Sequence, residues 1–138
     1  KFHEIIPDSV TAVVRGKKPD KTERVILCCG KVYFDLVSHR EKEKISNAAI
    51  IRIEQLYPLD ETQLRAAVEA FPKKAQLIWC QEEPQNMGAW TFIEPRLRAL
   101  FEREVGYAGR GASASPAVGA LALHKREQAC LIGDAFSI

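Results

Sequence analysis

The stretch RVILCCGKVYFDLVSHREKEK, residues 24–44, decides the fold of this chain. Its run from Val25 to Cys29 carries no charge, which is typical of a strand buried on both faces of a sheet. Gly30 ends the run, and the segment Lys31 to Lys44 has an apolar half of the kind found on a helix that packs against a sheet. The stretch therefore predicts a strand, a turn and a helix. The apolar half consists of Val32, Tyr33, Phe34, Leu36 and Val37.

The same alternation continues along the chain. Ala49 to Glu54 is a second β-branched run, Gln76 to Cys80 is a third apolar run, and Val105 to Gly109 is typical of a short fourth strand. Strands separated by helices pair in parallel through right-handed crossovers. We therefore expect an α/β fold, a three-layer sandwich in which helices cover both faces of a mostly parallel sheet.

Three further helices are predicted between and after these strands. Asp60 and Gln63 have the spacing of a capping box, and the apolar residues behind them follow helical periodicity. A second helical stripe runs from Trp90 to Phe101, where Pro95 lacks the N–H that a helix needs, so we expect a break near Pro95. The last helix is expected from about Val118 to Phe136.

The N-terminal part has a different character from the rest. We divide the chain into an extension with a basic linker, residues 1–23, and a main domain, residues 24–138. His3 to Ile6 and Thr11 to Val14 both look extended, and whether either joins the sheet stays open. A sequence that begins at Lys1 without a methionine suggests a piece of a longer protein.

Composition excludes several classes of protein. The 138 residues are 46% hydrophobic and 28% charged, and 20 Lys and Arg against 18 Asp and Glu leave a net charge of +2, as expected for a globular domain. No apolar run approaches the roughly 20 residues of a membrane span, and no secretion signal opens the chain. The basic linker has no interleaved aromatic residues, so no nucleic-acid partner is expected.

The cysteines favour a reducing compartment. None belongs to a CxxC pair or has a histidine at ligand spacing, so no zinc or other metal site is expected. We interpret all four as buried, inert thiols of a cytoplasmic protein. They are Cys28, Cys29, Cys80 and Cys130.

Candidate ligand-binding residues cluster after the predicted strands. In open α/β sheets, ligands bind outside the carboxyl ends of the strands, where helix N-termini offer free backbone N–H groups. Four groups belong to that edge: Gly30 with Lys31, Gln81 with Glu82 and Glu83, Gly109 with Arg110, and the pair Ser113 and Ser115.

Each group has an ordinary structural alternative. Lys31 is either a phosphate ligand or a surface lysine at a helix start, because no Walker or dinucleotide motif surrounds it. Arg110 between two glycines either offers its fork to a phosphate or sits where small residues permit tight packing. One of Glu82 and Glu83 could be a general acid or base, but helix capping or an inter-subunit ion pair is favoured. For His124, a packed, hydrogen-bonded histidine is favoured over a base. No catalytic residue is expected.

Taken together, five motifs resemble the C-terminal domain of the thiamine-diphosphate-dependent component of 2-oxoglutarate dehydrogenases, over residues 24–136. More distantly, the chain is similar to the third domain of transketolases, which implies a transketolase C-terminal-like fold. The motifs are CGKVYFDL at 29–36, RIEQLYPLD at 52–60, WCQEEPQNMGAW at 79–90, GRGASASPAVG at 109–119 and the later His124.

The resemblance implies an oxidoreductase of the tricarboxylic acid cycle, which decarboxylates 2-oxoglutarate and transfers succinyl to the lipoyl groups of a partner acyltransferase. Thiamine diphosphate and magnesium would be held by earlier domains, so the present chain would carry no cofactor and would be inactive alone. What remains for it is homodimer assembly and allosteric binding of acetyl-CoA or AMP. The alternatives are a purely structural dimerisation module and a free-standing Rossmann-like nucleotide binder.

Matching positions imply an effector pocket. Its principal candidates are Lys31, Gln81 and Arg110, with Cys28 and His3 beside them; Ser113 and Ser115 join from the geometric argument. The chain departs from the family at three positions, where Gly111 replaces a proline, Cys29 a serine and Met87 a glutamine. The sequence leaves the identity of the effector open.

Overall fold

The computed structural model describes residues 5–6, 21–111 and 121–137. A five-stranded sheet forms its centre, with the spatial order β1-β3-β2-β4-β5. Strands β2, β3, β4 and β5 pair in parallel, and β1 runs antiparallel to β3 at the edge. The strands are β1 (Ile5–Ile6), β2 (Arg24–Cys28), β3 (Ala48–Ile53), β4 (Gln76–Pro84) and β5 (Val105–Arg110).

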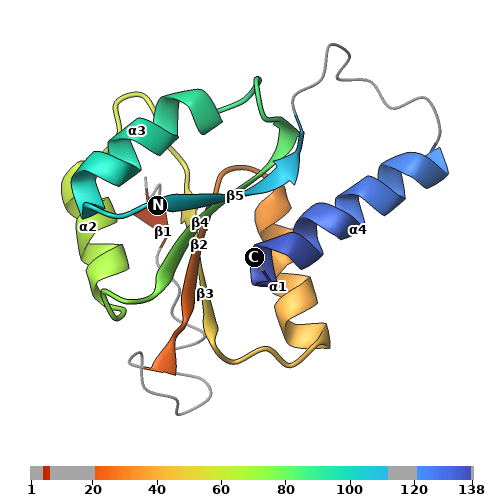
Figure 1. The fold of residues 1–138 in the computed structure, drawn as a ribbon, viewed down its shortest axis with the longest axis horizontal. Coiled ribbons are helices and arrows are strands. Elements are labelled where there is room, and N and C mark those ends of the chain that lie inside the picture. The colour runs from red at the N-terminus through yellow and green to blue at the C-terminus, as the bar shows by residue number, and fades with distance from the viewer. Residues whose placement is uncertain (1–4, 7–20, 112–120, 138) are drawn as a thin grey trace.

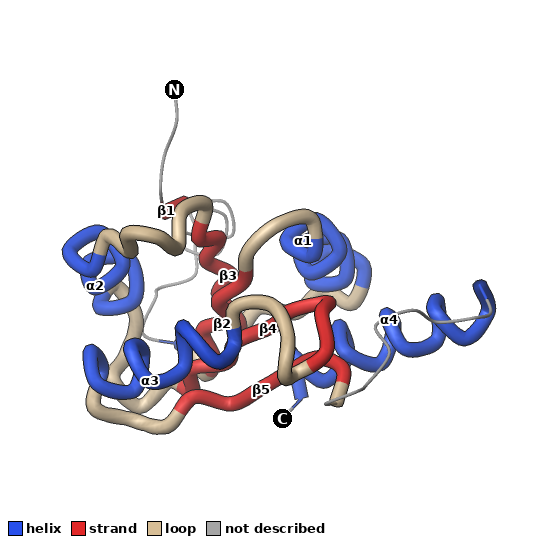
Figure 2. The backbone as a smooth tube through the Cα atoms, turned by 90° about the horizontal axis from the view of Figure 1, so that it is seen from above, coloured by secondary structure: helices blue, strands red, loops and turns tan. Residues whose placement is uncertain are grey.

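Helices cover both faces of this sheet, as Figures 1 and 2 show. Helices α2 (Glu61–Glu69) and α3 (Trp90–Phe101) lie on one face, and α1 (Val32–Lys42) and α4 (Leu121–Ser137) lie on the other. Side chains alternate between the faces of a strand, so each face builds its own core. Leu77 and Trp79 of β4 belong to the α2/α3 core, whereas Ile78 and Cys80 belong to the α1/α4 core.

The predicted fold class is confirmed: the molecule is a three-layer α/β sandwich with a mostly parallel sheet. The N-cap half of the predicted capping box is present, because Asp60 Oδ1 accepts a hydrogen bond of 3.0 Å from the backbone N–H of Gln63. The Gln63 side chain donates to Asp60 Oδ2 at 2.8 Å. Strand β4 is longer than predicted and continues past Cys80 to Pro84. The start of the last helix predicted at Val118 lies outside the described residues, and α4 is described from Leu121.

The break predicted near Pro95 is wrong. Helix α3 runs without interruption from Trp90 to Phe101 with Pro95 inside it. A proline disturbs the hydrogen bonds of the carbonyls in the preceding turn. The carbonyl that Pro95 leaves without its helical donor is that of Thr91, four residues earlier. Burial of Ile93 and Leu97 against the sheet holds both halves of the helix in place.

Of the two N-terminal segments that look extended, one joins the sheet. Ile5 pairs with Ile53 and Ile6 with Arg52, and Ile5 is buried in the α2/α3 core. The other segment, Thr11 to Val14, lies outside the described residues. The division of the chain at residue 23 stays a prediction.

The interpretation of the cysteines holds for two of the four. Cys28 and Cys80 are buried, Cys29 is half-buried, and Cys130 is exposed, which corrects the expectation that all four are buried. Cys130 lies on α4 next to the residues that pack on the sheet, and the helical turn carries its side chain outward. Over the described ranges, no helix has the length and apolar character that a membrane span requires.

Candidate functional site

The carboxyl ends of β2, β4 and β5 meet at one edge of the sheet, as the parallel pairing requires. Gly30 adopts a positive φ of 83°, which a side chain would strain, and turns the chain from β2 into α1. Lys31 then lies at the N-cap of α1, while Glu82 lies near the end of β4 and Arg110 at the end of β5. The polar contacts among these residues define the candidate site.

Lys31 and Glu82 form an ion pair across this edge. Lys31 Nζ lies 2.7 Å from Glu82 Oε1, and the Lys31 side chain is 78% exposed whereas that of Glu82 is 20% exposed. The hydrogen bond to Glu82, followed by the charge of the same carboxylate, raises the pKa of Lys31 above its ordinary value. Lys31 is therefore a fully charged ammonium at neutral pH, held against a carboxylate that is mostly shielded from water.

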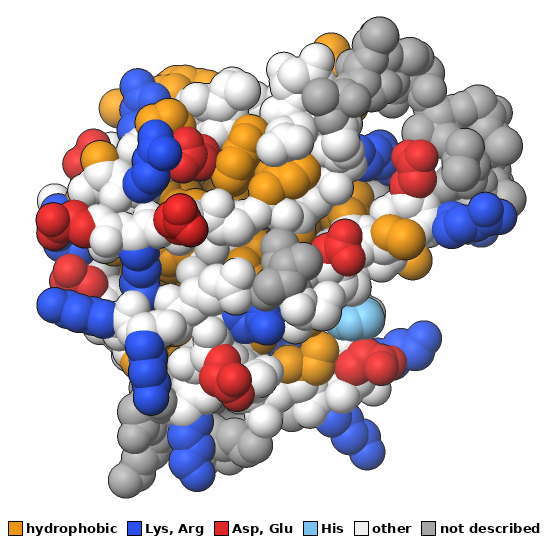
Figure 3. Space-filling model, viewed as in Figure 1, with side chains coloured by type: hydrophobic (Ala, Val, Ile, Leu, Met, Phe, Trp, Pro, Cys, Tyr) orange, Lys and Arg blue, Asp and Glu red, His pale blue; other side chains and the backbone are white. Residues whose placement is uncertain are grey.

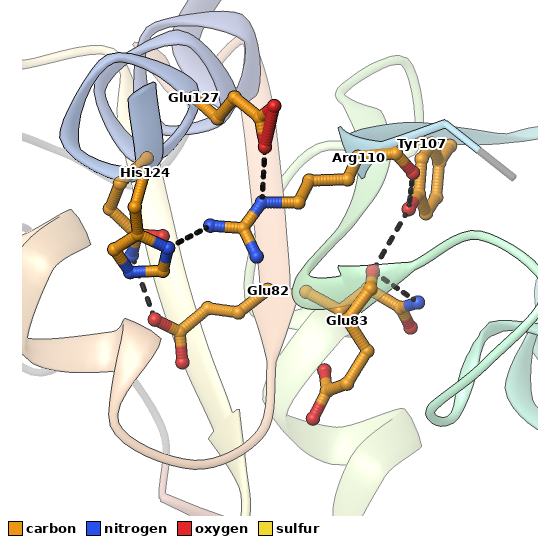
Figure 4. A network of polar contacts seen from close by, with 8 residues as sticks. Glu82, Glu83, Tyr107, Arg110, His124 and Glu127 are labelled. Atoms are coloured by element: carbon orange, nitrogen blue, oxygen red, sulfur yellow. Dashed lines mark hydrogen bonds and ion pairs between the residues drawn. The ribbon is translucent and has the colours of Figure 1, made fainter. Parts of the chain in front are cut away.

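Glu82 is also tied to α4. Gln128 Nε2 donates to Glu82 Oε1 at 2.8 Å and to Asp35 Oδ2 of α1 at 3.0 Å. The Gln128 amide thus bridges two carboxylates that reach it from different elements. In Figure 4 the side chains of Glu82 and Glu83 leave β4 in different directions, and only Glu82 points towards α4. Glu82 is the residue around which α1, β4 and α4 are joined.

Arg110 reaches from β5 to α4. Its side chain is 15% exposed, with Nε at 3.3 Å from Glu127 Oε1 and an Nη2 contact of 3.1 Å with His124 Nδ1. Figure 4 shows the guanidinium between these two side chains, on the same side as Glu82. Because arginine has only donors, His124 Nδ1 is the acceptor and carries no proton. This contact confirms the interpretation of His124 as a packed, hydrogen-bonded histidine.

Lys31 and Arg110 are brought to the same edge of the molecule. Lys31 contacts Glu82, which accepts from Gln128 of α4, and Arg110 contacts Glu127, the neighbour of Gln128 in sequence. We call the six residues Lys31, Glu82, Arg110, His124, Glu127 and Gln128 the edge network.

Gln81 faces the opposite side of β4 and is only 3% exposed. Its Oε1 accepts from Trp79 Nε1 at 2.9 Å and from the backbone N–H of Trp90 at 3.0 Å. Its Nε2 lies within hydrogen-bond distance of three backbone carbonyls of the following turn, those of Glu83, Pro84 and Met87. The amide of Gln81, a predicted effector residue, therefore binds groups inside the protein and holds the turn and the start of α3 in place.

Gly109, near the end of β5, packs on the same interior. A Cβ at Gly109 would lie 2.5 Å from the Tyr107 hydroxyl and 2.8 Å from the Gln81 carbonyl oxygen, so only glycine fits there. The Tyr107 hydroxyl donates to the Arg110 carbonyl at 2.5 Å, and burial raises the pKa of Tyr107 to about 12. A Cβ at Gly111 would meet nothing within 4 Å. For Arg110 between its two glycines, the sequence leaves a ligand and a packing interpretation open, and the close contacts at Gly109 favour packing.

Cys28 lies beneath the edge rather than on it. It is fully buried, its thiol contacts the Ile51 carbonyl at 3.7 Å, and burial raises its pKa well above the ordinary value. Its sulfur is accordingly a neutral thiol in contact with the core. Three other predicted effector residues, His3, Ser113 and Ser115, lie outside the described residues.

Two cavities flank the edge network. One of about 390 Å³ lies on the α2/α3 side and is lined by Cys29, Gly30, Gln81 and Glu83 among others. The second, of about 420 Å³, lies between α1 and α4 and is lined by Asp35, His124, Gln128 and neighbouring residues. Lys31 and Arg110 line neither cavity.

Comparison with known proteins decides the family. The model of the family described as 2-oxoglutarate dehydrogenase C-terminal matches residues 1–136. The chain belongs to this family. The 2-oxoglutarate dehydrogenase E1 component of Cupriavidus necator is 41% identical over 138 residues, and that of Azotobacter vinelandii is 40% identical over 142 residues; each match covers 99% of this chain. The E1 component of Brucella anthropi is 43% identical over 144 residues, covering 97% of this chain.

This 2-oxoglutarate dehydrogenase C-terminal chain spans only 14% of the length of each of these relatives. The described part of the chain contains no grouping of three or more His, Cys, Asp and Glu side chains suited to a metal ion. We assign the described residues no catalytic step. The chemistry available at the edge network is the binding of anions by an ammonium and a guanidinium.

Sequence reasoning missed two members of the network, Glu127 and Gln128. With His124 they stand at i, i+3 and i+4, the spacing that places side chains on one face of a helix. That spacing is visible in the sequence. What the sequence does not show is that this face of α4 lies against the ends of β4 and β5.

Proposed function

We propose that this chain is the C-terminal domain of a 2-oxoglutarate dehydrogenase E1 component and that it assembles and regulates the enzyme. The parent would catalyse the oxidative decarboxylation of 2-oxoglutarate and pass the succinyl group to lipoyl groups of the partner acyltransferase. Thiamine diphosphate and magnesium would be held elsewhere in the parent, and this part alone would be inactive. The support is membership of the family, together with 40% to 43% identity to three E1 components.

The regulatory role we propose is the binding of a phosphate-bearing effector, acetyl-CoA or AMP, at the edge network. The observation that carries it is the placement of Lys31 and Arg110 at one edge, each linked to the same face of α4. An ammonium and a planar guanidinium together suit a phosphate, which accepts from both. The N-terminus of α1 begins at the same point and adds backbone N–H groups.

Calorimetric titration of the full-length E1 component with acetyl-CoA and with AMP tests this role. Loss of a charge-assisted hydrogen bond should weaken binding about tenfold or more in Lys31→Ala and in Arg110→Ala. Arg98→Ala is the matched control, because Arg98 forms an exposed ion pair with Glu94 within α3, outside the edge network. Unchanged dissociation constants for both effectors in both variants would reject the effector site.

A second candidate is a purely structural dimerisation module. Gly109 and Gln81 support its structural half, since both serve interior packing at a place where the sequence predicts a ligand contact. On this alternative the calorimetric variants bind as the parent does, and the oligomeric state of full-length E1 depends on this domain. Homodimer assembly through this domain stays part of both proposals, and sedimentation of full-length E1 with and without the domain measures it.

We also propose a cytoplasmic location. The four cysteines are free, although Cys28 and Cys80 lie opposite each other on adjacent strands in one core. Free thiols are typical of a reducing compartment.

A further inference from the structure

The two cations proposed to hold the effector are already paired with carboxylates of this chain. Lys31 Nζ lies 2.7 Å from Glu82 and Arg110 Nε lies 3.3 Å from Glu127. Figure 4 shows Glu82 and Glu127 approaching the space around the Arg110 guanidinium from β4 and from α4. Any anion that binds to Lys31 and Arg110 must therefore compete with these two carboxylates.

The two partners of the first pair are held to different degrees. Glu82 is 20% exposed and also accepts from Gln128 at 2.8 Å, so its carboxylate is fixed by a second donor. Lys31 is 78% exposed, and its ammonium has a long, flexible stem. The lysine can therefore move to a ligand while Glu82 keeps its bond to Gln128. Exchange at this pair breaks only the contact that already faces water.

The second pair leaves part of the guanidinium unused. Arg110 Nε is buried, and among the described residues its N–H makes no hydrogen bond, although Glu127 lies within ion-pair distance. One Nη nitrogen contacts His124 Nδ1. Arginine binds phosphate and carboxylate best through two parallel N–H donors, and the Glu127 contact does not achieve this. A phosphate aligned with the guanidinium fork would satisfy donors that Glu127 leaves unsatisfied.

We propose that Glu82 and Glu127 form a carboxylate latch, an autoinhibitory contact in which they occupy Lys31 and Arg110 until a phosphate-bearing ligand exchanges for them. This inference rests on the effector site proposed above and adds its regulation and selectivity. A ligand with one carboxylate gains nothing over the internal carboxylates. A phosphate ester with two negative charges offers more acceptor oxygens to both cations, so the latch selects phosphate esters over monocarboxylates.

The test is calorimetry on full-length E1 saturated with thiamine diphosphate and magnesium, with AMP as the probe and acetate as the monocarboxylate. Glu82→Gln and Glu127→Gln keep the shape of each side chain and remove its charge. Since such pairs are worth up to about 1 kcal/mol, each variant should bind AMP more tightly than the parent by up to about fivefold. The double variant should bind AMP more tightly than either, and it alone should gain measurable affinity for acetate.

The control is Glu94→Gln, because the Glu94 side chain is 20% exposed, as that of Glu82 is, and pairs with the exposed Arg98 on α3 outside the edge network. It should leave AMP binding unchanged. Unchanged or weaker AMP binding in both latch variants, with Lys31→Ala and Arg110→Ala still weakened, overturns the latch and leaves the effector site standing. If none of the four variants alters AMP binding, the effector site falls and the latch falls with it. The two failures are thus distinguishable in one set of titrations.

Discussion

Gln81 and Glu82 are neighbours on β4, yet they take part in two opposite kinds of polar structure. Gln81 points to the α2/α3 side, is 3% exposed, and its amide is fully used by backbone and indole groups of the interior. Glu82 points to the α1/α4 side, where Lys31 and Gln128 bind it at the border with water. Successive residues of a strand face opposite sides of the sheet, so neighbouring positions carry a structural amide and a carboxylate that we propose to be exchangeable.

The difference shows what makes a polar contact replaceable. Breaking a bond of Gln81 leaves a buried donor or acceptor without water, which costs the full desolvation of that group. Breaking the Lys31 contact exposes an ammonium that is already mostly hydrated. The face view in Figure 3 shows side chains of both charge signs interspersed over the surface, as expected where single ion pairs contribute little. For this reason we expect the proposed ligand exchange on the Glu82 side.

The largest effect is expected from Gln81→Leu. This change leaves the indole N–H of Trp79, the backbone N–H of Trp90 and the carbonyls of the turn without their partner. At about 1–3 kcal/mol for each unsatisfied buried group, the free energy of unfolding should fall by about 4 kcal/mol or more. Urea denaturation followed by circular dichroism measures it on the same full-length protein used for the titrations.

Glu82→Gln is the matched control, one residue away. It should lower the free energy of unfolding by less than about 1 kcal/mol, since it removes the charge of an ion pair whose lysine is exposed. Gln81→Glu sharpens the comparison, because the carboxylate still accepts from Trp79 and Trp90 but faces three carbonyls without a donor. Equal losses in Gln81→Leu and Glu82→Gln would contradict the distinction between the two sides.

A smaller effect is expected from Gly109→Ala, which attacks the interior side through the backbone. The new Cβ would meet the Tyr107 ring and the Gln81 carbonyl oxygen at 2.5–2.8 Å. Overpacking of this kind should cost about 2 kcal/mol in thermal or urea unfolding. The same substitution at Gly111 meets open space and should cost less than about 0.5 kcal/mol.

A double variant locates the clash. Tyr107→Phe removes the atom nearest to the new methyl group, so the cost of Gly109→Ala should be lower in that background. The recovery should be partial, because the Gln81 carbonyl oxygen is backbone and cannot yield. Additive losses in the double variant would place the strain somewhere other than against the tyrosine.

The same contrast explains how much the sequence could predict. Runs such as Val25 to Cys29, closed by Gly30, specify a buried strand and its turn wherever the strand sits, and the Asp60 capping box is a local signal. These features predict the three-layer fold. Pro95 misleads because its effect on a helix depends on tertiary burial of Ile93 and Leu97, which local sequence does not reveal.

The site was only half predictable. That Lys31 and Arg110 share an edge follows from parallel pairing, which periodicity indicates. A glutamine after an apolar run looks the same whether it faces a ligand or a buried turn, so the sequence alone assigns Gln81 a ligand role. The partners of the cations come from α4, and the position of α4 on the sheet depends on Leu131, Ile132 and Ala135 filling the α1/α4 core.

The smallest effect is expected from Cys28 and Cys80, the two thiols of the α1/α4 core, which lies on the Glu82 side of β4. Burial raises the pKa of Cys80 to about 12 and that of Cys28 also well above its ordinary value of 9.0. Unfolded thiols ionise above about pH 9 while the folded ones stay protonated. Stability from these groups is therefore complete below pH 9 and is lost as the pH rises above it.

Cys28→Ala should remove one of these contributions. Between pH 8 and pH 10 each buried thiol lowers the free energy of unfolding by about 1 kcal/mol. Over this interval the free energy of unfolding of the variant should therefore fall by about 1 kcal/mol less than that of the parent. Cys130→Ala, which removes an exposed thiol, is the control and should follow the parent. Urea unfolding at the two pH values gives the difference. If Cys28→Ala and Cys130→Ala show the same dependence on pH, then water reaches Cys28, and the core under the edge network is less closed than its burial implies.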